Sequence, residues 1–163
     1  MYHAKLDLIR TEKAIKEVKD TFERLLAKAL NLSRISAPLF VPADSGLNDN
    51  LNGVERPVSF DISHAGVRAE VVQSLAKWKR YALKKYGFSY GEGLYTDMNA
   101  IRRDEITDNI HSIFVDQWDW EKVIKQEERT LDTLKETVNT VYKCLRKTEK
   151  YMAIQYDYIE EIL

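Results

Sequence analysis

The sequence contains little of what marks secreted, membrane or zinc-binding proteins. It has one cysteine, Cys144, in 163 residues, so no internal disulfide can form, which is typical of a reducing cytoplasm. No apolar run approaches the roughly 20 residues of a membrane span, and the N-terminal MYHAKLDLIR has no signal-peptide pattern. Three histidines without metal-ligand spacing predict no metal site. These absences predict a cytoplasmic domain with no membrane partner.

A charge excess of one sign and the usual phosphate-binding loops are also missing. The 25 Lys and Arg residues nearly balance 26 Asp and Glu residues, for a net charge of -1. This balance argues against a dedicated nucleic-acid binder, whose affinity would come from clustered positive charge. The sequence has no P-loop, no G-x-G-x-x-G and no G-x-S-x-G. No glycine follows Gly93.

Apolar spacing predicts three helices. The first runs from Thr11 to Leu30, because Ile15, Val18, Phe22, Leu25, Leu26 and Ala29 recur at steps of three and four. A shorter helix is expected from Ser74 to Tyr86, with Ser74 as its N-terminal cap and Gly87 as its C-terminal cap. A long helix or helix pair is expected from Glu127 to Leu163. Its apolar stripe consists of Leu131, Leu134, Val138, Val141, Leu145 and Met152.

The residues between the first and last helices carry the strand patterns. An extended piece is expected over 34–40, a loop over 41–56, and two strands over 57–62 and 68–73 joined by a turn at His64 to Gly66. The best strand candidates are 94–102 and 111–120. Connections of hairpin length predict an α+β fold, in which helices flank an antiparallel sheet.

Two polar segments precede the best strands and allow two interpretations each. LNDNLNG (47–53) is either a surface loop, which its composition favours, or a binding loop in which Asp49 contacts a charged ligand. QSLAKWKR (73–80) is either a solvated basic helix face, the more probable reading of its pattern, or a helix start that binds an anion.

Two further polar segments lie on the strands themselves. Alternation from Leu94 places Arg102 at the end of an apolar row, where it is either a phosphate ligand or part of an exposed hairpin tip. In HSIFVDQWDWE (111–121), Gln117 and Asp119 share one face of a strand, and two adjacent polar side chains there favour a ligand site.

Together these segments resemble the ammonia-dependent asparagine synthetase family, also called aspartate–ammonia ligase. The resemblance is carried by SGLNDNLNGVERPVSF (45–60), SLAKWKR (74–80), GEGLYTDMNAIRRDE (91–105) and HSIFVDQWDWE (111–121), in the family's order. It implies a catalytic domain like that of class II aspartyl- and asparaginyl-tRNA synthetases. The first helix and residues 35–38 are similar to motif 1, which builds a dimer interface. Residues 94–105 are similar to motif 2, whose arginine grips the nucleotide.

The resemblance implies a reaction in two steps. The β-carboxylate of L-aspartate attacks the α-phosphorus of ATP with Mg²⁺ assistance, and ammonia then displaces AMP from the β-aspartyl adenylate to give L-asparagine. By position, Asp49, Ser74, Lys79, Gln117 and Asp119 match the amino-acid pocket. Gln73 and Arg102 match the nucleotide site, Arg102 at the α-phosphate, and Lys79 and Arg102 are the expected catalytic residues. A homodimer is expected.

Two departures from the family pattern qualify these expectations. Gln73 stands where the family has a histidine, which puts binding of the adenylate at this position in doubt because glutamine cannot become a cation. Residues 1–163 match only the amino-terminal half of the catalytic domain, and the half with the glycine-rich motif 3 is absent. The alternative is therefore a catalytically incomplete fragment or a non-catalytic binding module. A tRNA-synthetase fragment is disfavoured, since residues before Thr11 leave no room for an anticodon-binding domain.

Overall fold

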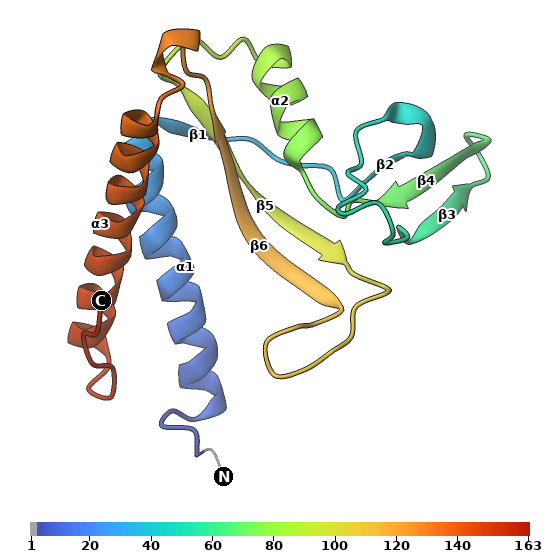
Figure 1. The fold of residues 1–163 in the computed structure, drawn as a ribbon. Helices are drawn as coiled ribbons and strands as arrows, with labels where there is room; N and C mark the ends of the chain where they lie inside the picture. The colour runs from blue at the N-terminus through green and yellow to red at the C-terminus, as the bar shows by residue number, and fades with distance from the viewer. Residues whose placement is uncertain (1–2) are drawn as a thin grey trace. The chain divides into compact units, whose positions relative to one another are not determined.

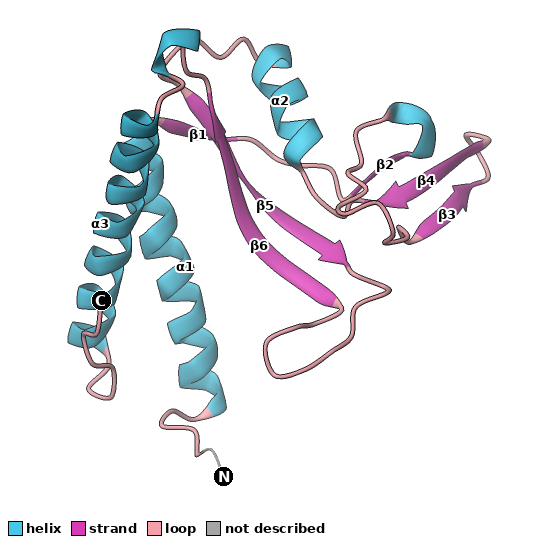
Figure 2. Cartoon of the chain, viewed as in Figure 1, coloured by secondary structure: helices cyan, strands magenta, loops and turns pink. Residues whose placement is uncertain are grey.

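The computed structural model describes residues 3–163, which form two compact units. One unit comprises the chain up to Leu32 together with Ile124–Leu163, and the other comprises Ser33–Val123. The helical unit contains the two long helices, and the second unit contains the short helix and most of the strands (Figures 1 and 2). The elements in chain order are α1 (Leu8–Leu30), β1 (Leu32–Arg34), β2 (Phe40–Pro42), β3 (Ser59–Ile62), β4 (Val67–Val71), α2 (Ala76–Lys85), β5 (Gly93–Ile101), β6 (Phe114–Lys122) and α3 (Leu131–Gln155), with short 3₁₀ turns at Ala43–Ser45 and Gln126–Glu128.

Side-chain caps fix the start of both long helices. The Asp7 carboxylate accepts a hydrogen bond from the Arg10 amide at 2.8 Å, and α1 starts directly after it. Thr130 caps α3 in the same way by accepting from the Thr133 amide. Each cap satisfies an amide that would otherwise lack a partner in the first turn. At its other end α1 stops at Asn31, which adopts the left-handed conformation common at helix ends.

The two long helices pack against each other along a face that only partly matches the predicted stripes, since Leu26 of α1 and Met152 of α3 are the predicted members that are buried. On α3 the buried residues are Cys144, Thr148 and Met152, which recur every four residues. On α1 they are Ala14, Thr21, Leu26 and Leu30. Small side chains at Ala14 and Thr21 let the helices approach closely, and this contact surface leaves Ile15 and Val18 exposed among the described residues.

The predicted extension of the last helix to Leu163 is wrong. Helix α3 ends at Gln155, and Tyr156 takes an extended conformation. The Tyr156 side chain is buried beside Ala14 and Met152. Packing of this aromatic ring on α1 therefore accompanies the end of the helix, although the residues beyond it carry no glycine or proline.

The strands form two three-stranded sheets rather than one. The first has the order β1-β5-β6 and the second the order β2-β4-β3. In the described part of the second sheet, β4 pairs antiparallel with both neighbours, and β5 pairs antiparallel with β6 over its whole length. The predicted α+β class with helices beside antiparallel strands is thus confirmed. Gly66, with φ of 63°, closes the predicted turn between β3 and β4.

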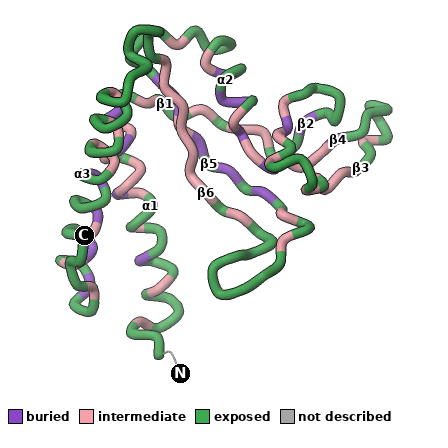
Figure 3. Tube along the Cα trace, in the orientation of Figure 1, coloured by how far each residue is buried: buried purple, intermediate pink, exposed green. Residues whose placement is uncertain are grey.

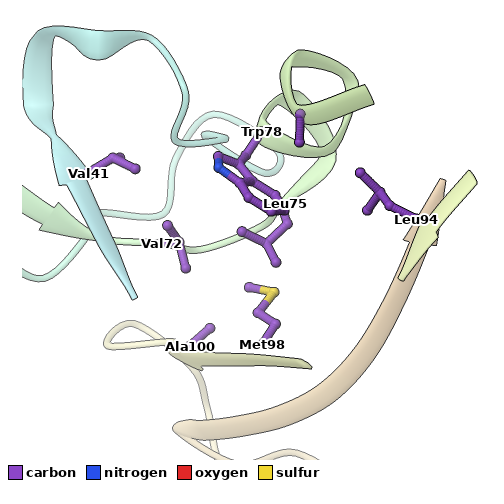
Figure 4. Packing of buried hydrophobic residues seen from close by; sticks show 8 residues of the cluster. Val41, Val72, Leu75, Trp78, Leu94, Met98 and Ala100 are labelled. Carbon is purple, nitrogen blue, oxygen red and sulfur yellow. The ribbon is translucent and has the colours of Figure 1, made fainter. Parts of the chain in front are cut away.

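The core of the second unit lies between α2, the end of β4 and one face of β5 (Figure 4). Its buried members are Val41, Val72, Leu75, Trp78, Ala82, Leu94, Met98 and Ala100. The predicted alternation along β5 is confirmed, since Leu94, Thr96, Met98 and Ala100 are all buried and the residues between them are more exposed (Figure 3). This core fixes the position of α2 over the sheet.

Several predicted boundaries shift in the structure. The strand expected from His111 begins at Phe114 and continues to Lys122, because residues 108–111 fold into a local turn around the Asp108 carboxylate. The extended piece expected over 34–40 is flanked by β1 and β2 instead of forming one strand. Ser74 is not the N-cap of α2, which is Leu75, although the Ser74 hydroxyl accepts from the Ala76 amide at 3.2 Å.

Candidate active site

One face of the β5–β6 ribbon combines apolar and charged side chains. The register pairs Met98 with Gln117, Thr96 with Asp119, and Leu94 with Glu121. Directly opposed residues in an antiparallel pair point to the same side of the sheet. Gln117, Asp119 and Glu121 therefore share the face of β5 that α2 covers. The prediction that Gln117 and Asp119 share a face is confirmed, and Glu121 joins them.

Lys79 brings a positive charge from α2 to this face. Its residue is 6% exposed, whereas Lys77 and Arg80 on the same helix are exposed. The Lys79 ammonium donates to Asp119 Oδ1 at 2.7 Å and to the Trp120 carbonyl at 2.9 Å. Glu121 Oε2 lies 3.4 Å away. The reading of this segment as a uniformly solvated basic face is therefore wrong at Lys79.

The charges around Lys79 do not cancel. Two carboxylates, Asp119 and Glu121, face one ammonium, and each is roughly a quarter exposed, with side-chain values of 25% and 29%. An ammonium has three protons, and two of them are donated to oxygens of the chain. Glu121 is the third and longer partner of the same ammonium, at 3.4 Å. The cluster therefore carries an excess of negative charge, which suits a ligand that brings a cationic group.

The loop that contains Asp49 is held in place by its neighbour Asn48. The Asn48 side chain is buried, and its amide nitrogen donates to Glu70 Oε2 at 3.1 Å and to the Val71 carbonyl at 3.3 Å. Its oxygen accepts from the amides of Gln73, at 2.9 Å, and Asp49, at 3.1 Å. Asn48 thus joins the loop to the residues between β4 and α2, and the surface-loop reading does not account for it.

A second polar site lies beside the β5–β6 connection. A pocket of about 80 Å³ is lined by Glu55, Gln73 and residues 102–105. Gln73 is only 1% exposed. Its Oε1 and the Arg102 Nε are buried atoms without a hydrogen-bond partner among the described residues. Both residues line the pocket, and burial of an unpaired polar atom is costly, so this pocket is a candidate ligand site.

An ion pair fixes the segment that carries Arg102. Arg56 binds the Asp104 carboxylate through both its guanidinium and its backbone amide, the latter at 3.0 Å. Arg103 also donates to the Pro57 carbonyl, at 3.4 Å. The hydrogen bonds from Arg56 lower the pKa of Asp104 to about 2. The pair therefore stays charged at neutral pH and ties the turn after β5 to the chain before β3.

The structure brings the predicted residues together in two groups. Lys79, Gln117 and Asp119 share the sheet face, and Gln73 and Arg102 line the small pocket. Ser74 follows Gln73 in the chain, and the Asp49 amide donates to Asn48 Oδ1 at 3.1 Å. Sequence reasoning missed Glu121, Asn48 and the Arg56–Asp104 pair. The alternation that selected Gln117 and Asp119 also selects Glu121, whereas the long-range contacts of Asn48 and Arg56 have no signal in the sequence.

No group of three or more His, Cys, Asp or Glu residues within 3–163 is placed to hold a metal ion. None of the helices described for this chain combines the length and apolar character needed to cross a membrane.

Comparison with known proteins identifies relatives across the whole chain. The family model described as aspartate-ammonia ligase matches residues 9–163. The chain is 62% identical to the aspartate–ammonia ligase of Clostridium perfringens (strain SM101 / Type A), over 99% of this chain and 48% of the relative. It is 59% identical to the aspartate–ammonia ligase of Ruminiclostridium cellulolyticum, with the same coverage. The chain thus spans about half the length of these relatives.

Solved structures show the same fold at low sequence identity. The pyrrolysyl tRNA synthetase PylSc of Desulfitobacterium hafniense matches with a TM-score of 0.57 and 12% identity, over 81% of this chain and 46% of that one. The asparaginyl-tRNA synthetase of Entamoeba histolytica matches with a TM-score of 0.54 and 12% identity, over 93% of this chain and 31% of that one. These two matches show a class II synthetase-like fold alone.

Proposed function

The chain belongs to the aspartate–ammonia ligase family, and from this premise we propose that it forms the amino-terminal half of an ATP-dependent asparagine synthetase. The enzyme would join ammonia to the β-carboxylate of L-aspartate through a β-aspartyl adenylate, and release AMP and pyrophosphate. The observation that carries the proposal is the 55–62% identity to ligases of this name over essentially the whole chain. The charge cluster at Lys79 supports it independently.

The Lys79 cluster is the proposed aspartate site. A carboxylate of the substrate pairs with the Lys79 ammonium in place of Asp119, and the substrate ammonium pairs with Asp119. Lys79 and Asp119 then each keep an ion-pair partner, which a buried site requires. Gln117 supplies an amide beside Asp119 on the same strand. Asp49 and Ser74 complete the proposed pocket from the Asn48 loop and the start of α2.

The pocket beside Arg102 is the proposed site of the nucleotide's α-phosphate. The unpartnered Nε of Arg102 is a charged donor, and phosphate oxygens are its natural acceptors. Gln73 lines the same pocket. Mg²⁺ would reach this site bound to ATP, mainly through phosphate oxygens, as is usual for magnesium at nucleotide sites.

In this reaction the protein contributes mainly by orienting the substrates and by stabilising charge. A carboxylate is a poor acceptor for an amine, and adenylation gives it a good leaving group. Lys79 holds the amino acid and Arg102 holds the phosphate, so the reacting oxygen and phosphorus meet in a fixed geometry. The Arg102 guanidinium also offsets the negative charge that develops on phosphorus. Lys79 and Arg102 are therefore the residues on which catalysis would depend most.

The second candidate function is a non-catalytic module that binds aspartate or a partner chain. It is favoured by Gln73, which lines the proposed phosphate pocket but cannot become a cation as a histidine can. A product assay distinguishes the two candidate functions once the chain is completed with the second half of the Clostridium perfringens relative. The ligase proposal expects asparagine, AMP and pyrophosphate in equal amounts from aspartate, ATP and ammonia. Binding of aspartate without any product would favour the module, and release of ADP would contradict the adenylate. We propose a cytoplasmic protein, because its single cysteine, Cys144, can form no internal disulfide.

A further inference from the structure

Arg56 and Asp104 join two segments that line the pocket of Arg102. Glu55 and residues 102–105 are among the residues that line this pocket, and Arg56 follows Glu55 directly in the chain. The Arg56 backbone amide donates to Asp104 Oδ2 at 3.0 Å, its Nε donates to the same oxygen at 3.1 Å, and its Nη2 donates to Oδ1. One residue, 48 positions away in the chain, thus binds both carboxylate oxygens of Asp104.

Without this restraint the Asp104 carboxylate would compete for Arg102. The two residues are two positions apart and line the same pocket of about 80 Å³. The Arg102 Nε is buried and has no hydrogen-bond partner among the described residues. Carboxylates and phosphates both match the bidentate geometry of a guanidinium. A released Asp104 could therefore pair with Arg102 and exclude a phosphate from it.

We propose that Arg56 is a positioning residue for adenylation, which holds Asp104 so that the Arg102 guanidinium stays free for the α-phosphate of ATP. This inference rests on the proposed function and adds a residue to it. Arg56 acts on the nucleotide through Asp104 and Arg102 and does not contact the substrate. Its side chain is 67% exposed, whereas that of Asp104 is 26% exposed, so the carboxylate is the member of the pair that lies closer to the pocket interior.

The backbone around Asp104 is held independently of Arg56. The Arg102 amide donates to the Ile113 carbonyl at 2.8 Å, and the Glu105 amide donates to the Arg102 carbonyl at 3.0 Å. These two bonds continue the β5–β6 pairing and close the turn over 102–105. Loss of the Arg56 side chain should therefore release the Asp104 carboxylate while the backbone of Arg102 stays in place.

Asp104 remains charged when Arg56 is removed. Hydrogen bonds from Arg56 lower the pKa of Asp104 to about 2, and an unperturbed aspartate has a pKa of about 3.9. The carboxyl group is ionised at neutral pH in either case. A second cation, Arg103, also lowers the pKa of Asp104, but its guanidinium donates to the Pro57 carbonyl at 3.4 Å. Removal of Arg56 therefore leaves an uncompensated carboxylate beside Arg102.

The test is a double-mutant cycle in the chain completed with the second half of the Clostridium perfringens relative. Aspartate-dependent ATP–pyrophosphate exchange measures adenylation without ammonia. Arg56→Gln should lower kcat/KM for ATP about fivefold or more and leave the KM for aspartate within about twofold. In the Asp104→Asn background the same Arg56→Gln change should cost less than about twofold, because no free carboxylate remains. Arg68→Gln, at an exposed arginine of β4, is the matched control and should change neither value.

The two backgrounds distinguish positioning from other roles of Arg56. If Arg56 contacted the nucleotide directly or only stabilised the fold, Arg56→Gln would cost the same with and without the Asp104 carboxylate. If Arg103 took over Asp104, Arg56→Gln would leave kcat/KM for ATP unchanged. Either result would overturn the positioning role and leave the ligase proposal standing. Arg56→Met repeats the cycle if Arg56→Gln does not fold. Absence of both exchange and asparagine formation in the unmodified protein would instead overturn the proposed function.

Discussion

The surroundings of Lys79 distinguish best between a ligand site and a purely structural role. It is buried next to two carboxylates, and burial of an ion pair is weak evidence for stability because desolvation offsets much of the attraction. An excess of negative charge around one lysine is therefore better explained by a ligand than by the fold. The charge pattern matches an amino acid, which brings one ammonium and at least one carboxylate.

The first prediction concerns the affinity for aspartate. In the completed protein, Lys79→Ala removes a charge-assisted hydrogen bond of about 1.5–3 kcal/mol. The value of kcat/KM for aspartate should then fall about tenfold or more, as measured by pyrophosphate release at varied aspartate. Lys84→Ala, an exposed lysine of the same helix, should change it by less than about twofold. An unchanged aspartate dependence in Lys79→Ala would show that this cluster is not the amino-acid site.

The second prediction concerns the pH dependence of the Arg56–Asp104 pair. Hydrogen bonds from Arg56 lower the pKa of Asp104 from 3.8 to about 2. A carboxyl whose pKa is lower in the folded state stabilises the fold above its unfolded pKa and loses that effect as the pH falls toward the folded pKa. Asp104→Asn should therefore lower the Tm at pH 5–7, and the difference from the unmodified chain should shrink below about pH 4. Circular-dichroism melts from pH 7 to pH 3 measure this, and a difference that does not vary with pH would contradict it.

The β5–β6 ribbon shows how far a strand pattern can be read from sequence. A period of two needs only the local pleat, so the buried row from Leu94 to Ala100 and the common face of Gln117 and Asp119 followed from alternation alone. The start of β6 did not follow, because the Asp108 carboxylate binds two backbone amides and removes residues 108–111 from the strand. Such a local turn competes with strand pairing in a way that propensity does not reveal.

For the long helices, the sequence predicted the elements better than the face along which they pack. Their existence and the burial of Leu26 and Met152 followed from apolar spacing, but the rest of the contact face did not, because both helices carry more apolar residues than one contact can cover. The packed residues Ala14 and Thr148 are small, and close approach of the helices selects them over larger neighbours. The Asn48 network could not be predicted either, since it joins residues more than twenty positions apart.

The third prediction separates the two faces of α3. Met152 is 3% exposed and packs with Ala14 and Tyr156, whereas Leu134 is 57% exposed. Met152→Ala should lower the free energy of unfolding of the 163-residue chain by about 2–5 kcal/mol, because it leaves a cavity. Leu134→Ala should lower it by less than about 0.5 kcal/mol. Urea titration of both variants measures the two values, and equal effects would mean that the exposed stripe is packed in solution.

At the scale of the whole molecule, α3 presents an apolar stripe that the described residues leave uncovered. Leu131, Leu134 and Val138 on this helix are each more than half exposed. Monomeric proteins rarely leave large contiguous apolar areas in water. The relatives are about twice as long as this chain, so their second half offers a source of covering surface.

The fourth prediction concerns assembly. The resemblance of α1 and residues 35–38 to motif 1 leads us to propose a homodimer of the completed protein. Sedimentation equilibrium at micromolar concentration should give twice the mass of one chain. A monomer at that concentration would refute the dimer without affecting the assignment of the active site, since Lys79, Gln73 and Arg102 all lie within Ser33–Val123 of one chain.

The fifth prediction concerns what this chain does by itself. The proposed sites for aspartate and the α-phosphate both lie on it, but these 163 residues hold no glycine after Gly93 and therefore no glycine-rich loop beyond it for the remainder of the nucleotide. Tight binding of ATP needs contacts along the whole molecule, and remote contacts contribute to the rate of the chemical step. The isolated 163-residue chain should therefore form no measurable asparagine or AMP from aspartate, ATP and ammonia. Addition of the second half of the Clostridium perfringens relative as a separate polypeptide should restore asparagine formation if it covers the α3 stripe, and Leu134→Glu should then weaken the association. Asparagine made by the isolated chain would show that the residues described here are sufficient for catalysis.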